Sequence, residues 1–186
     1  GLDPESPTAG NEDPLWIADI EDPLPVWLSE TGIFSDLSTL SPTDGSHVYE
    51  PPHPLWSNAA DKLRFLFVPE GSRISLDENA LWRFPVGTVM TKTFTMPRIE
   101  GRRRTVAIET RVMFRRDSGW DYAVYHWNST GTEARLESGN WGQIELRLSD
   151  TTGNELPYMI PGKLDCRGCH ETKVGEPVIG IHPLNF

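Results

Sequence analysis

The stretch RRRTVAIETRVMFRRDSGWDYAVYHW, residues 102–127, decides the fold. Its first half alternates in side-chain character with a period of two, which is typical of a half-buried β-strand. RDSGW is a turn signal, and WDYAVYHW reads as a returning strand, so the stretch predicts a β-hairpin. One expected face of the first strand carries Val106, Ile108, Thr110, Val112 and Phe114, and the other carries Glu109, Arg111 and Arg115.

Short strand-like segments recur on both sides of this hairpin. They are LRFLFVP (63–69), LWRFP (81–85), VGTVMTKTFTMP (86–97), TEARLES (132–138) and QIELRLS (143–149). Sixteen glycines and sixteen prolines supply turns between them, and no helical period exceeds about two turns. We therefore expect a mostly β protein, an antiparallel β-sandwich or open barrel, with a C-terminal segment of loop or short helix.

The chain of 186 residues is long enough for one domain with a hydrophobic core. Residues 1–30 read as an extended, acidic, proline-rich arm, whose apolar side chains should lie against the domain. Residues 31–155 form the expected β domain. Residues 156–186 form a segment that we expect to pack on it. The tryptophans of the strand patterns are expected in the core, with the lining of a cofactor crevice as the alternative, and they are Trp56, Trp82, Trp120, Trp127 and Trp141.

The formal charge of −10 argues against nucleic acid as a partner, because phosphate binding needs clustered lysines and arginines. No basic residue precedes Lys62, which makes the first third of the chain an acidic surface or a docking strip for a basic partner. No apolar run approaches the roughly 20 residues that cross a bilayer, so we expect no membrane span.

Both cysteines lie in one pentapeptide, CRGCH, residues 166–170. Cys-x-x-Cys-His is the attachment motif of a c-type haem. Two thiols on consecutive turns of a short helix can reach the two vinyl groups, and the adjacent histidine can bind the iron. The motif therefore predicts one covalent haem c on Cys166 and Cys169, with His170 as the proximal ligand. A zinc site lacks a second ligand pair, a redox dithiol lacks a βαβ context, and chance is the remaining alternative.

The distal iron ligand stays open at this point. His182 and Met159 are the leading candidates, one after and one before the motif. The other candidates are His53, His126, Met90, Met96, Met113 and a residue of a partner chain, although a methionine on a strand is usually core filler. The candidate cationic partners for the haem propionates are Arg102, Arg103, Arg104, Arg167 and Lys173. The first three could instead be a solvated strand end or bind an acidic partner.

Five ordered stretches resemble a family of exported bacterial proteins with a β domain followed by a single CxxCH. They are YEPPHPLWSNAADKLRFLFVPEG, WRFPVGTVMTKTF, AIETRVMFRRDSGWDYAVYHWN, IPGKLDCRGCH and IGIHPLN. The shared signature runs PLWSxxAxK, FPVGTxxxKTF, IETR, YxWN and CxxCH, and it spans the chain from about residue 28 to the end. Members of this family occur near, or fused to, periplasmic dehydrogenases and cytochromes, so the resemblance implies an electron-transfer haem protein.

We therefore expect a monohaem c-type cytochrome that transfers single electrons, an electron carrier rather than a catalyst. It would be a subunit or docking partner of a larger redox complex, in the periplasm or outside the cell, with its signal peptide not present in this chain. Stacking into a homo-oligomer or filament is a further expectation. Two alternatives remain, a five-coordinate haem enzyme acting on peroxide or a nitrogen oxide, and a haem-based sensor or binding module.

Overall fold

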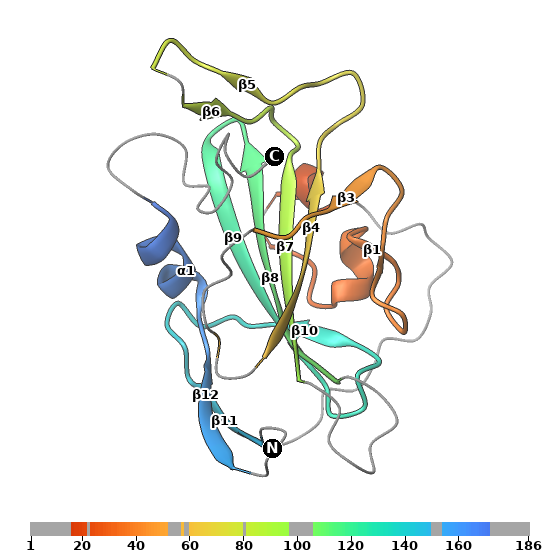
Figure 1. Ribbon diagram of the computed structural model, residues 1–186, viewed down its shortest axis with the longest axis vertical. Helices are drawn as coiled ribbons and strands as arrows, with labels where there is room; N and C mark the ends of the chain where they lie inside the picture. Colours follow the sequence, from red (N-terminus) through yellow and green to blue (C-terminus); the bar gives the residue numbers. More distant parts are fainter. Residues whose placement is uncertain are drawn as a thin grey trace.

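A six-stranded antiparallel sheet forms the centre of the protein, in the strand order β10-β9-β8-β7-β4-β3 (Figure 1). The computed structural model describes residues 16–21, 23–51, 57, 60–79, 81–96, 106–149 and 154–171. The strands of this sheet are β3 (Ser46–Val48), β4 (Asp61–Phe67), β7 (Val89–Met96), β8 (Val106–Arg116), β9 (Gly119–Trp127) and β10 (Ala134–Leu136). The expected mostly β, antiparallel fold class is confirmed.

Three two-stranded sheets and three short helices complete the described fold. The small sheets are β1 (Phe34–Asp36) with β2 (Ser41–Pro42), β5 (Ser75–Leu76) with β6 (Trp82–Arg83), and β11 (Ile144–Ser149) with β12 (Glu155–Ile160). The helices are the 3₁₀ turns η1 (Ile17–Asp19) and η2 (Leu28–Thr31) and the α-helix α1 (Lys163–His170). Among the described helices, none has the length and hydropathy needed to cross a bilayer.

The hairpin expected over residues 102–127 is confirmed as β8 and β9. The two strands pair from Arg116 with Gly119 back to Glu109 with His126, around a two-residue turn. Gly119 follows that turn with a φ of 133°, a value that side chains disfavour and glycine accepts. Residues 102–105 lie outside the described part of the chain.

The predicted faces of β8 need a correction at a β-bulge. The pairing with β7 passes from Phe94–Glu109 to Thr95–Ala107, which leaves Ile108 as an extra residue. Ile108 consequently packs in the same cluster as Met113, and not with Val112 as the simple alternation predicts. The strand is also buried on both faces rather than on one.

One face of the sheet is covered by the N-terminal segment. Ile17 and Leu28 have no exposed surface and share a hydrophobic cluster with Phe114 and Tyr125. The Tyr125 hydroxyl donates a hydrogen bond to the carbonyl of Pro25 over 3.1 Å. In Figure 1 this segment, drawn in red and orange, lies to the right of the sheet. The described residues of the N-terminal segment are therefore part of the core.

The opposite face is covered by the hairpin β11–β12 and by α1, which lie to the left of the sheet in Figure 1. Tyr158 and Ile160 of β12 and Cys166 of α1 are buried in the second hydrophobic cluster. Because β12 begins at Glu155 and pairs with β11, the C-terminal segment continues a hairpin that starts at Ile144.

The tryptophans occupy different environments, although all were expected in the core. Trp127 is buried, while Trp82 and Trp120 are partly buried against the second cluster. Trp141 is 60% exposed, which makes the core expectation wrong for this residue. Trp56 lies outside the described residues.

Candidate functional site

The CRGCH motif lies on α1, and Asp165 fixes the start of this helix. Oδ2 of Asp165 accepts hydrogen bonds from the backbone N–H of Gly162 over 2.9 Å and of Gly142 over 2.7 Å. The first bond caps the helix, because a carboxylate near a helix N-terminus satisfies an otherwise unpaired donor. The second bond ties the helix to the loop before β11.

Close backbone packing and an ion pair also hold α1 in place. A Cβ atom added to Gly162 would meet the carbonyl oxygens of Gly139 and Asn140 at 2.6 Å. The N–H of Leu164 donates to the Asn140 carbonyl over 2.8 Å. The Lys163 ammonium lies 2.5 Å from Oδ1 of Asp121 on β9. The helix that carries the motif is therefore attached both to the 139–142 loop and to the central sheet.

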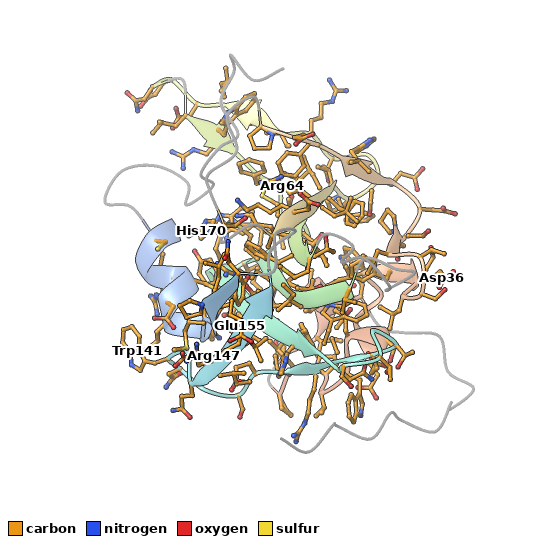
Figure 2. All side chains as sticks on the ribbon, turned by 60° about the horizontal axis from the view of Figure 1, so that its bottom comes forward. Asp36, Arg64, Trp141, Arg147, Glu155 and His170 are labelled. Atoms are coloured by element: carbon orange, nitrogen blue, oxygen red, sulfur yellow. The ribbon has the colours of Figure 1, made fainter. Side chains whose placement is uncertain are left out.

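The three motif residues lie at helical positions i, i+3 and i+4, which share one face of an α-helix. Cys166 is 8% exposed, Cys169 is exposed, and His170 is partly buried. The His170 and Tyr122 ring centroids are 6.0 Å apart. Figure 2 shows His170 at the end of α1 nearest the strands, whereas Trp141 stands at the periphery.

The Cys166 thiol is kept in its neutral form by its surroundings. The pKa of Cys166 is raised to about 11, mainly by burial and also by Glu109, while Arg111 opposes the shift. A redox dithiol instead needs a cysteine that ionises readily, because the thiolate is the nucleophile. The environment of Cys166 therefore does not suit dithiol exchange.

A row of three basic residues crosses the sheet face that α1 covers. Arg64 of β4 lies directly opposite Lys92 of β7, and Lys92 lies directly opposite Arg111 of β8. We call these three residues the cationic row. The neighbouring row along the strands is apolar and consists of Leu66, Met90, Met113 and Tyr122.

Glu109 is a fully buried carboxylate on the same face. Its Oε1 atom accepts hydrogen bonds from Arg111 Nη2 over 2.5 Å, from Arg111 Nε over 3.1 Å, and from the Tyr158 hydroxyl. The Oε2 atom has no hydrogen-bond partner among the described residues. The guanidinium of Arg111 also lies 4.3 Å from the centre of the Phe94 ring. Arg111 is thus neutralised and fixed by its neighbours.

Tyr122 is a buried polar residue beside the motif histidine. It is 2% exposed, and its hydroxyl has no hydrogen-bond partner within the described ranges. Burial is the main cause that raises the pKa of this hydroxyl, so the group is a neutral donor at any ordinary pH. A buried tyrosine hydroxyl usually finds a partner, so this donor remains free to bind a further acceptor.

The structure separates the candidates for a distal ligand. Met159 is 51% exposed and alternates along β12 with the buried Tyr158 and Ile160, so it lies on the face of β12 away from the sheet. His126 is partly buried on β9, opposite Glu109. Met90, Met96 and Met113 are buried in the second hydrophobic cluster. The remaining candidates, His53 and His182, lie outside the described residues, as do Arg102, Arg103, Arg104 and Lys173.

Sequence reasoning missed the cationic row, Glu109 and Tyr158. Arg64 and Lys92 each interrupt an otherwise apolar or threonine-rich strand, and this was the available signal. Their juxtaposition needs the register of three strands, which the sequence does not specify. Glu109 was placed with Arg111 and Arg115 on the charged face of a half-buried strand, and the structure shows it fully buried.

The residues on α1 carry the donor groups that a c-type haem would need. Two thiols and an imidazole on one helix face are the donor set of a c-type haem. No cluster of three or more histidines, cysteines or acids suited to a metal ion occurs among the described residues. The unpaired Tyr122 hydroxyl beside His170 is consistent with a group that the chain alone does not supply.

Comparison with known proteins gave no relatives: no protein-family model, curated protein or solved structure matches the chain.

Proposed function

We propose that the protein is a monohaem c-type cytochrome that transfers single electrons. The observation that carries the proposal is the arrangement on α1, where Cys166, Cys169 and His170 share a helix face beside Tyr122. The bound haem would supply one-electron redox chemistry. The sequence resemblance to exported proteins with a single CxxCH supports the same assignment.

Each motif residue has a distinct role in this proposal. Cys166 and Cys169 hold the haem through two thioether bonds, and His170 is the proximal iron ligand. The bonds of Asp165 and the ion pair of Lys163 keep α1 fixed against β9. A fixed helix is useful to an electron carrier, because little structural change then accompanies oxidation and reduction.

We place the protein outside the cytoplasm, as a subunit or docking partner of a larger redox complex. The acidic surface suits a basic redox partner, because complementary charge steers association. The larger complex could also be a homo-oligomer or filament of haem-bearing copies of this chain.

The test is a visible absorption spectrum of the protein made with the c-type maturation machinery. We expect sharp, split α and β bands on reduction and a low-spin oxidised form. Haem should remain on the chain in denaturing electrophoresis. The Cys166→Ala and Cys169→Ala double variant is the control, and it should carry no covalent haem.

Other spectra would change the assignment. High-spin bands that shift with carbon monoxide would favour the five-coordinate enzyme or the sensor. Absence of haem bands in the wild-type protein would refute the haem assignment. A Met159→Leu variant with an unaltered low-spin spectrum would exclude Met159 as the distal ligand, as its exposed position predicts.

A further inference from the structure

The cationic row places like charges opposite one another on three neighbouring strands. In the antiparallel register, Arg64 lies directly opposite Lys92, and Lys92 lies directly opposite Arg111. Like charges directly opposite in a sheet are destabilising. Arg64 is only 5% exposed, so water does not screen its charge effectively.

The described residues give this row little direct ion pairing, although Glu50 and Tyr49 act favourably on the charge of Arg64. Glu109 forms an ion pair with Arg111, and no such pair to Arg64 or Lys92 occurs in the described part of the chain. Burial, followed by the neighbouring cations Arg111 and Arg64, lowers the pKa of Lys92 to about 8. A buried charge is costly unless it is paired. The row therefore indicates a missing anion.

The cationic row adjoins the candidate haem site. Cys166 packs in the same hydrophobic cluster as Met90 and Met113, which lie two residues along their strands from Lys92 and Arg111. Tyr122, two residues along β9 from the register partner of Arg111, lies on the same sheet face, and its buried hydroxyl group has no hydrogen-bond partner among the described residues. Arg64 Nη1 donates a long hydrogen bond to the Lys62 carbonyl over 3.5 Å. Because both cations and the Tyr122 hydroxyl are donors, a group that binds this row must carry acceptor oxygens.

We infer that Arg64 and Lys92 bind the propionate carboxylates of the haem held by Cys166 and Cys169. Carboxylates accept charge-assisted hydrogen bonds from guanidinium and ammonium groups, and they would balance the row. This inference rests on the proposed function. It replaces Arg167 as the propionate partner, because Arg167 is exposed and already pairs with Glu171 over 2.7 Å.

The cations then have a measurable effect on the redox equilibrium. A positive charge near the haem disfavours the more positive, oxidised iron and raises the reduction potential. Removing one such charge should lower the equilibrium constant for reduction by on the order of tenfold, which is about 59 mV for a one-electron couple.

The experiment compares the midpoint potentials of haem-loaded Arg64→Gln and Lys92→Gln with that of the wild type. Arg147→Gln is the matched control, because Arg147 is an exposed arginine on β11. We expect a lower potential in both test variants and an unchanged potential in the control. Covalent haem content, measured by mass spectrometry, is recorded for every protein.

Each remaining outcome is decisive. Unchanged potentials in both test variants, with full haem content, would overturn the inference and leave the proposed function standing. A wild-type protein without haem would overturn both. Because Arg64 is buried, the charge-conserving Arg64→Lys and Lys92→Arg variants are also made. Haem loss in the two Gln variants but not in the charge-conserving variants would support the inference. Haem loss in all four variants would show that the row has a purely structural role, and this would overturn the inference.

Discussion

Tyr158 of β12 donates a hydrogen bond from its hydroxyl to Oε1 of Glu109 on β8, a carboxylate with no exposed surface. This contact joins the C-terminal hairpin to the centre of the sheet across 49 residues of chain. It also lies beside the ion pair between Glu109 and Arg111. The hydrogen bond therefore links the hairpin that precedes α1 to the charged interior of the protein.

Tyr158→Phe is expected to lower the free energy of unfolding by about 1–3 kcal/mol. The variant removes one donor from a buried carboxylate, and an incompletely satisfied buried charge is more costly than a neutral group. Urea denaturation of the haem-free protein measures the change. Ser35→Ala is the control, because it removes an exposed hydroxyl and should change stability by less than about 0.5 kcal/mol. Equal stability of Tyr158→Phe and the wild type would show that the bond is not needed.

Two glycines near the motif should respond to alanine in opposite directions. Gly162→Ala would place a Cβ atom at 2.6 Å from backbone atoms of Gly139 and Asn140, so the start of α1 must move away from the loop. Gly168 lies inside α1 with no atom within 4 Å of an added Cβ. Gly168→Ala should therefore raise the free energy of unfolding by about 0.5–1 kcal/mol, because alanine favours the helix.

Thermal unfolding of the two haem-free glycine variants measures this contrast. Gly162→Ala should unfold at a lower temperature than the wild type, and Gly168→Ala at a higher temperature. A Gly162→Ala protein as stable as the wild type would mean that the close contact between α1 and the 139–142 loop is not required.

The sequence was sufficient for the hairpin, for the antiparallel class and for the short helix, because each depends on local periodicity and turn residues. The bulge at Ile108 was not predictable, since it depends on the pairing with β7 and not on β8 alone. The three motif residues were found from their spacing. The cationic row was missed because Arg64 and Arg111 are distant in sequence and meet only through strand order.

The stability of the haem-free protein should depend on pH through Lys92. Its folded pKa of about 8 is below the ordinary value of 10.5, so the unfolded chain binds more protons above pH 8. Stability should therefore rise from pH 8 to 9 in the wild type relative to Lys92→Met, by at most about 1.4 kcal/mol per pH unit. The other charged or titratable groups acting on Lys92 are Arg111, Arg64, Lys62 and Cys166, and both proteins retain them.

Urea denaturation of the two proteins at pH 7, 8 and 9 tests this effect. The difference between two proteins removes the contributions of the cysteines and tyrosines, which titrate in both. A parallel pH dependence of wild type and Lys92→Met would show that Lys92 has an ordinary pKa in the folded protein.

The two cysteines should differ in reactivity when the protein carries no haem. Cys169 is exposed, whereas Cys166 is buried and its pKa is raised to about 11. Alkylation proceeds through the thiolate, so burial and a high pKa both slow the reaction at Cys166. We expect iodoacetamide at pH 8 to modify Cys169 at least about tenfold faster than Cys166. Peptide mass spectrometry over time gives both rates in one sample.

The same measurement on haem-loaded protein distinguishes a free, buried thiol from a sulfur bonded to haem. Thioether sulfurs have no thiol to react, so neither cysteine should be alkylated, even after unfolding in urea. In the haem-free protein, urea should expose Cys166 and make the two rates similar. Reaction of Cys166 in urea in the purified, haem-loaded protein would show that this residue is a free thiol. Its burial would then come from packing against β9 alone. The haem would be held by at most one thioether bond, through Cys169.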